Sequence, residues 1–269
     1  MSIIISGDNA ILWVTRISVV YLIINCAEKL YAANQYKNSD ILGWYDLRRH
    51  TYFLHRPNFI KAILNGIFCF NTWIALIALR GILAIMVLFL SASGFLTTLC
   101  LGAIFVIISL SNLRAKPLGA ETEDRVMVMI TGALFLRSLM PDAYVTTICL
   151  WFIALQSCLS YVAAGLAKIN NKSWLKGNGL YNVFTTGNFH SEKLGQFAID
   201  HWKLVRLISW ATIIIECAFP LVLIVKTPYG LFFLIWGVIF HFIIALIFKF
   251  GKFFLVWIAT YPAILFVIQ

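Results

Sequence analysis

Long apolar runs, separated by short polar or charged clusters, follow one another along almost the whole chain. A helix needs ~20 mostly apolar residues to cross the hydrocarbon core of a bilayer, so runs of this length predict membrane-spanning helices. The apolar region from Asn65 to Leu113 is too long for one helix and fits two spans that turn near Ser93. We therefore predict an all-α, polytopic transmembrane bundle of about eight spans, at residues 10–28, 65–91, 94–113, 126–140, 144–169, 204–225, 231–248 and 253–269.

A polar and aromatic segment, 170–203, separates two of these predicted spans. Its residues include Trp174, Tyr181 and the pair His201-Trp202, along with several glycines. Tryptophan and tyrosine are typical of the membrane–water interface. We expect this segment to form an interfacial, partly re-entrant cap on a single membrane domain that covers 1–269.

The composition supports a membrane protein, since 61% of the 269 residues are hydrophobic and only 12% are charged. A soluble domain is about 45–50% apolar and about 25% charged. The formal net charge of +10 would suggest nucleic-acid binding in a soluble protein. Here the Lys and Arg residues gather in the loops after the first, third, fifth and seventh predicted spans, and the exceptions are Arg16, Arg80, Arg137 and Lys226. By the positive-inside rule these loops are cytoplasmic, so we expect a multi-pass protein of the cell membrane, in contact with lipid and not with nucleic acid.

Ionisable side chains inside the predicted spans are the first candidates for chemistry, because each costs ~2.5–3.5 kcal/mol to insert. Glu216 has apolar neighbours on all sides, so its carboxyl group must be protonated or paired, and Arg16 or Arg80 could be a structural partner. His241 also lies mid-span. A buried imidazole can form a structural hydrogen bond across helices or relay protons.

Lys168 ends the predicted span 144–169. A lysine in such a place commonly extends its amine to the interface. Four small residues precede it: Ala163, Ala164, Gly165 and Ala167. Small residues let neighbouring backbones approach closely, which would bury the lysine in the bundle, where a desolvated amine can act as a base.

Asp124 and Arg125 stand just before the predicted span 126–140. An acidic residue at a helix start interacts favourably with the helix dipole, so ordinary capping explains Asp124. A role at the polar end of a functional pocket is the alternative. The sequence has no C-x-x-C pair, Gly-x-Ser-x-Gly, P-loop or H-E-x-x-H motif, so we predict no metal site.

The run from Tyr161 to Gly177, YVAAGLAKINNKSWLKG, resembles the signature of the vitamin K-dependent γ-carboxylase membrane domain. That domain is shared with small bacterial proteins, often called HTTM (horizontally transferred transmembrane) proteins. The resemblance continues in order through His201-Trp202, the stretch from Glu216 to Pro220, His241, the stretch from Ile247 to Gly251, and Pro262. In the N-terminal half it rests on the layout of the spans and on Tyr45 to Arg49.

The resemblance implies that Lys168 is the base that deprotonates a vitamin K-type hydroquinone, with His241 and Glu216 as relay or positioning partners. It implies a pocket whose other residues are Tyr161, Gly165, Trp174, His201, Trp202, Asp124 and Arg125. The reduced quinone would be the cofactor. The chain departs from the carboxylase in having Asp124-Arg125 where that enzyme has a histidine, and in lacking its large extracytosolic domain.

Three hypotheses follow. Small bacterial members of the sporulation-delaying protein B type are the nearer analogue by size, and they act in the maturation of a secreted antimicrobial peptide. The first hypothesis is therefore a factor, enzymatic in nature, that matures a secreted peptide. The second is a quinol-dependent glutamyl carboxylase, and the third is a non-catalytic partner subunit for immunity, chaperoning or transport. The family's active face is extracytosolic, whereas the charge pattern places the Lys168 end in the cytoplasm.

Overall fold

The computed structural model describes residues 5–37, 40, 42–50, 53, 55–91, 94–118, 122–186, 191–225, 227–249 and 251–269. All regular structure in these ranges is helical, and they contain no strand, which confirms the predicted all-α class. The predicted turn near Ser93 lies outside the described residues.

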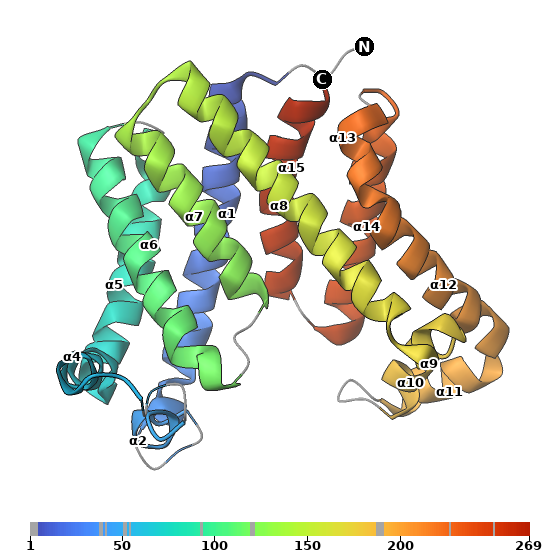
Figure 1. The fold of residues 1–269 in the computed structure, drawn as a ribbon, viewed down its shortest axis with the longest axis horizontal. Helices are drawn as coiled ribbons and strands as arrows, with labels where there is room; N and C mark the ends of the chain where they lie inside the picture. The colour runs from blue at the N-terminus through green and yellow to red at the C-terminus, as the bar shows by residue number, and fades with distance from the viewer. Residues whose placement is uncertain are drawn as a thin grey trace. The chain divides into compact units, whose positions relative to one another are not determined.

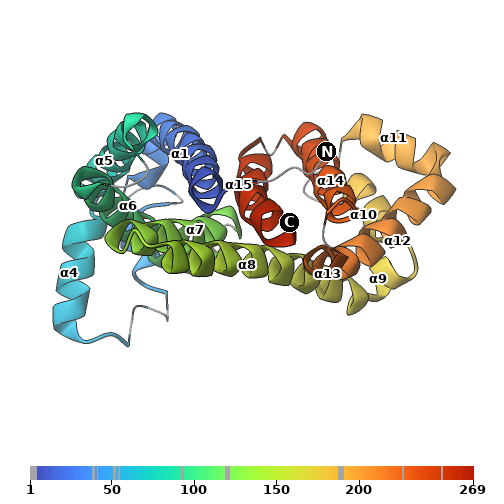
Figure 2. The ribbon, with the colours of Figure 1, turned by 90° about the horizontal axis from the view of Figure 1, so that it is seen from above.

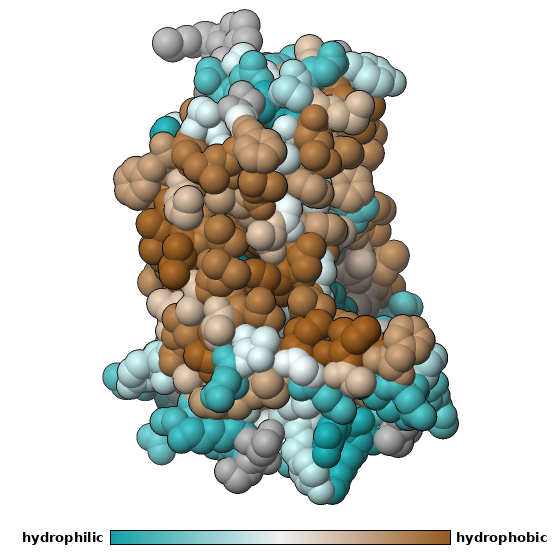
Figure 3. Space-filling model, turned by 90° about the vertical axis from the view of Figure 1, so that its left-hand side faces the viewer, coloured by the Kyte–Doolittle hydropathy of each residue, from teal (hydrophilic) through white to brown (hydrophobic). Residues whose placement is uncertain are grey.

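Seven of the described helical segments are long and apolar enough to cross a membrane. They are α1 (Gly7–Tyr31), α5 (Phe70–Phe89), α6 (Phe95–Ala115) with the following turn to Leu118, α8 (Ala143–Ile169), Trp202–Val225, α14 (Gly230–Phe248) and α15 (Gly251–Ile268). Figure 3 shows a broad hydrophobic band between two hydrophilic ends on the side of the molecule that includes α5 and α6. The chain is therefore a multi-pass helical membrane protein.

The remaining predicted span, 126–140, lies in helix α7 (Thr122–Leu139), which packs along α6 and α1. Its 18 residues include Glu123, Asp124 and Arg125 at the start and Arg137 near the end. These charges set α7 apart in composition from the seven apolar segments. Its middle, 126–136, contains no charged residue.

The predicted span 65–91 is wrong at its start. A separate helix, α4 (Asn58–Phe68), occupies the first residues, and Cys69 adopts an extended conformation (φ −61°, ψ 152°) before α5 begins. The apolar run continues across this break, so hydropathy does not reveal it. The break is held by packing, because Phe68 and Trp73 on either side of Cys69 are both buried and meet edge to face at 5.6 Å.

Helix α4 runs across the end of α5 and not along it. Figure 1 shows α4 end-on while α5 lies in the plane of the picture, and Figure 2 shows the length of α4. Phe59 and Ile63 on α4 are 67% and 55% exposed. An amphipathic helix that lies across the end of a span and exposes such residues suits the plane of the membrane interface.

The described chain divides into two compact units. The N-terminal unit comprises Ile5–Ile153 and Phe250–Phe266, and the C-terminal unit is essentially Ala154–Lys249 with Val267–Gln269. In the N-terminal unit α1 packs on α5, α5 on α6 and α6 on α7 around a core that includes Leu22, Ile104 and Met127. The prediction of a single membrane domain stays a prediction.

The C-terminal unit consists of the second part of α8, three short helices and the last two bundle segments before α15. The short helices are α9 (Lys172–Leu175), α10 (Gly179–Thr185) and α11 (Glu192–Asp200), and they occupy the predicted cap segment 170–203. Helix α12 (Trp202–Ala218) passes into the 3-10 turn η3 (Phe219–Leu221) and then α13 (Val222–Val225). Pro220 lies in that turn, as expected where a proline removes a helical hydrogen bond.

Candidate functional site

Lys168 and Glu216 form a bidentate ion pair between α8 and α12. The Lys168 Nζ lies 2.9 Å from Oε1 and 2.7 Å from Oε2 of Glu216. Their side chains are 21% and 5% exposed, so the lysine is turned into the C-terminal unit and does not extend freely to the interface. The pair compensates a carboxylate that would otherwise stand alone among apolar side chains.

Gly165 allows this contact by bringing the two helices together one turn before Lys168. A Cβ atom at Gly165 would lie 2.5 Å from Sγ and 3.1 Å from the backbone nitrogen of Cys217, the neighbour of Glu216. Real Cβ atoms essentially never lie within 3.0 Å of such an atom, and a contact of 3.1 Å is tighter than most. The glycine is thus required by the packing of α8 against α12, and this packing places the amine opposite the carboxylate.

Trp174 covers the amine from the side of the cap. Its ring centroid lies 5.3 Å from the Lys168 Nζ, within the range of a cation–π interaction. Gly179 packs directly against the indole, and Trp210 on α12 donates a 2.9 Å hydrogen bond to the carbonyl of Leu175. These contacts attach α9 and α10 to α12 and hold the Trp174 ring over the ion pair.

Tyr161 and His241 form a second buried polar contact in the same unit. The Tyr161 hydroxyl lies 2.7 Å from His241 Nε2, which joins α8 to α14. The Tyr161 ring stacks on Phe219 of η3 with centroids 3.7 Å apart, and both Tyr161 and His241 are almost fully buried. Tyr161 precedes Lys168 by seven residues, so the two polar contacts lie two turns, about 10 Å, apart along one face of α8.

The other predicted pocket residues of this unit lie elsewhere. His201 precedes α12 and its ring packs against Phe197 at 4.9 Å, while Trp202 is 49% exposed. Both lie about 20 Å from Glu216 along the axis of α12. The structure therefore joins Lys168, Glu216, Gly165 and Trp174 in one cluster and Tyr161 with His241 in another.

Asp124 and Arg125 belong to the N-terminal unit. Asp124 is buried, forms a 2.7 Å ion pair with Lys29 and accepts a 2.9 Å hydrogen bond from the Tyr21 hydroxyl. Arg125 is exposed. Asp124 is thus part of a buried network that joins α7 to α1, a role beyond capping.

The same N-terminal network holds Arg80, one of the predicted partners of Glu216. Arg80 is fully buried and donates hydrogen bonds of 2.6 Å to Asn25 Oδ1 and 3.3 Å to Ser111 Oγ. The prediction that Glu216 pairs with Arg16 or Arg80 is wrong, because the carboxylate is taken by Lys168. Hydropathy along the chain cannot show which helices of a bundle are neighbours.

Sequence reasoning missed several of these residues. Tyr21, Asn25 and Lys29 recur every four residues on α1, and this polar stripe is a signal of one helix face facing a partner. Cys217 and Phe219 carry no such signal, since they are apolar residues in an apolar run. Among the described residues, no group of three or more His, Cys, Asp or Glu side chains could hold a metal ion, and the six cysteines are free thiols.

Comparison of the chain with models of protein families, with curated proteins and with solved structures finds no match. The class that fold and site define is a multi-pass helical membrane protein with an ion pair and a tyrosine–histidine contact buried in its C-terminal unit.

Proposed function

We propose that this chain is a cell-membrane protein that matures or modifies a secreted peptide, with Lys168 as the proton-accepting residue of an intramembrane site. The observation that carries the proposal is the buried, bidentate pair of Lys168 and Glu216 beside Trp174. It joins the two residues that the resemblance to the carboxylase membrane domain implies for this role.

Glu216 provides a way for the amine to become a base without water. Burial removes most of the hydration of the carboxylate and much of that of the amine, so the advantage of the ionic pair over a neutral amine and carboxylic acid is reduced. A proton that moves along the 2.7 Å bond from Nζ to Glu216 leaves an uncharged amine. That amine can then accept a proton from a substrate placed on its open side.

The donor set at Lys168 fits a reduced quinone, the cofactor that the resemblance implies. An amine that can accept a phenolic proton lies beside an indole face, and such a face can stack on an aromatic ring. Bound there, the hydroquinone would supply an acidic hydroxyl group. Lys168 would accept its proton, Glu216 would hold Lys168 in place, and Trp174 would cover the ring.

Substitution of Lys168 tests the proposal. Lys168→Ala removes the amine, and Lys168→Arg keeps the charge opposite Glu216 but removes a group that can lose its proton. We expect both variants to reach the membrane and to abolish maturation of the peptide, measured by mass spectrometry of the secreted product. The matched control is Lys172→Ala, an exposed lysine at the start of the next helix, α9. Normal maturation with Lys168→Arg would refute the role as a base.

A non-catalytic membrane partner is the second candidate, and one observation favours it. Glu216 holds the amine with both oxygens, as a purely structural pair would do. Replacing both residues with methionine distinguishes a structural role from a catalytic one. Methionine keeps a similar side-chain volume between the helices but can neither accept nor donate a proton. Full maturation by Lys168→Met/Glu216→Met would establish the structural role.

A glutamyl carboxylase, the remaining candidate, would incorporate labelled CO₂ into the peptide in the presence of reduced quinone.

A further inference from the structure

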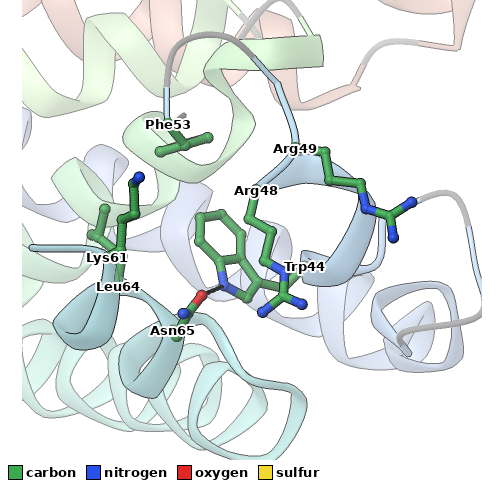
Figure 4. A pocket seen from close by; sticks show the side chains of 7 residues that line it. All are labelled: Trp44, Arg48, Arg49, Phe53, Lys61, Leu64 and Asn65. Carbon is green, nitrogen blue, oxygen red and sulfur yellow. Dashed lines mark hydrogen bonds between the residues drawn. The ribbon is translucent and has the colours of Figure 1, made fainter. Parts of the chain in front are cut away.

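A pocket with a basic rim lies in the N-terminal unit, between α2 (Trp44–Leu47) and α4 (Figure 4). Its volume is about 320 Å³, and its lining includes the three cationic residues Arg48, Arg49 and Lys61. Pockets for small ligands span roughly 300–1,000 Å³, so this one suits a headgroup and not a whole lipid. It lies in the other unit from Lys168 and is independent of the function proposed above.

The floor of the pocket is aromatic and already rigid. Trp44 donates a 2.8 Å hydrogen bond from its indole nitrogen to Asn65 Oδ1 on α4. Its ring meets Phe53 edge to face at 5.0 Å and Phe68 at 4.7 Å. A floor that is held from three sides needs little ordering when a ligand arrives.

The rim carries positive charge without compensation. In the described part of the chain, none of Arg48, Arg49 and Lys61 forms an ion pair with a carboxylate. Figure 4 shows Arg48 and Lys61 on opposite sides of the Trp44 indole and Arg49 pointing away from it. Both guanidinium groups also contact the Tyr45 ring, at 4.8 Å and 4.1 Å, so two like charges are gathered at one place.

The position of α4 at the membrane interface indicates which anions can reach the basic rim. Helix α4 crosses the end of α5, and its Phe59 and Ile63 are exposed, as in a helix that lies in the membrane interface. Lys61 and Asn65 lie on the same helix at the edge of the pocket. The anions at that depth are the phosphates of lipid headgroups, and basic pockets beside spans bind such headgroups.

We propose that this pocket binds the headgroup of an anionic phospholipid. Arg48 and Lys61 bind the phosphate, and the Trp44 ring packs against the start of the glycerol backbone. Arginine and lysine are the residues that recognise phosphate in proteins. A zwitterionic lipid carries the same phosphate with a cation attached, which the basic rim repels, so net negative charge decides the preference.

The experiment uses the full-length protein purified in neutral detergent with either phosphatidylglycerol or phosphatidylcholine of identical acyl chains. Native mass spectrometry counts the lipids retained by the wild type and by Arg48→Gln/Lys61→Gln. The control is Lys172→Gln/Lys176→Gln, which removes two exposed charges outside the pocket. We expect the wild type and the control to retain phosphatidylglycerol about tenfold better than phosphatidylcholine, and the pocket variant to lose that preference.

Two results would overturn the proposal: equal retention of both lipids by the wild type, or an unchanged preference in the pocket variant. Inorganic phosphate and glycerol 3-phosphate form the water-soluble arm. If either stabilises the wild type against heat as much as phosphatidylglycerol does, the site binds a free phosphate and the lipid assignment is wrong. If the pocket variant does not fold, the proposal is judged from the wild type alone, by its retention of phosphatidylglycerol relative to phosphatidylcholine.

Discussion

The ion pair between Lys168 and Glu216 offsets the free-energy cost of burying either charge alone. The Glu216 carboxylate is 5% exposed among apolar side chains and loses most of its hydration. The ion pair with Lys168 offsets the free-energy cost of that loss. Asp124 and Lys29 do the same in the N-terminal unit. In both cases one partner lies near the end of a helix, and the other approaches it from a different helix.

We predict that Glu216→Gln lowers the free energy of unfolding by about 3 kcal/mol, because it leaves the Lys168 amine without its counter-charge. The double variant Lys168→Met/Glu216→Met should lie within about 1 kcal/mol of the wild type, since both charges are gone and the volume is kept. Unfolding in mixed micelles measures both. A double variant as unstable as Glu216→Gln would show that packing, and not charge, accounts for the loss.

Cys69 is an exposed thiol at the break between α4 and α5. Hydrogen bonding from the side chain and backbone of Thr72 holds the pKa of this thiol below its ordinary value. A lower pKa means more thiolate near neutral pH and faster alkylation. We predict that Thr72→Val slows the reaction of Cys69 with iodoacetamide at pH 7.5 and moves the rate–pH curve to higher pH. Cys69→Ser identifies the signal, and an unchanged curve in Thr72→Val would contradict the hydrogen-bond explanation.

At the scale of helices, the approach of α8 to α12 depends on a missing side chain. A Cβ at Gly165 would clash with the sulfur of Cys217 at 2.5 Å and would crowd its backbone nitrogen at 3.1 Å, so the close contact involves the backbone of α12 and not only one side chain. The break at Cys69 is the opposite case. There the aromatic cluster of Trp44, Phe68 and Trp73 holds two apolar helices at an angle.

We predict that Gly165→Ala lowers stability by about 2 kcal/mol through overpacking. Gly165→Ala/Cys217→Ala should recover part of the loss, because the sulfur is removed while the backbone nitrogen stays at 3.1 Å. Gly66→Ala is the matched control: nothing lies within 4 Å of its Cβ position on α4, so it should be neutral or slightly stabilising. Thermal unfolding in detergent compares the three, and equal effects at Gly165 and Gly66 would refute the close approach.

At the scale of the whole molecule, helix α7 decides the number of membrane spans. Its 18 residues extend about 27 Å, close to the ~30 Å of a bilayer core, and it packs beside α6. We predict that α7 crosses the membrane, which makes eight spans. Single cysteines at Lys116 and Asp142, in a chain without its own cysteines, should then react with an impermeant maleimide from opposite sides.

The charge pattern adds the direction: Lys116 should react only after the membrane is opened, and Asp142 without it. Reaction of both positions from one side would reduce the number of spans to seven. The reverse order would keep eight spans and place the Lys168 end outside, as the resemblance to the carboxylase domain implies.

The sequence alone determines the helical class and seven of the membrane segments, because the length and hydropathy of a run are properties of neighbouring residues. It also points to Lys168, Glu216 and His241, since a polar residue in an apolar run is costly wherever the chain goes. Only the tertiary structure decides that Lys168 meets Glu216, that Tyr161 meets His241, and that Arg80 meets Asn25. The physical reason is that apolar helices present similar surfaces to one another, so their order is set by close packing at positions such as Gly165 and by the pairing of buried polar groups, neither of which hydropathy along the chain records.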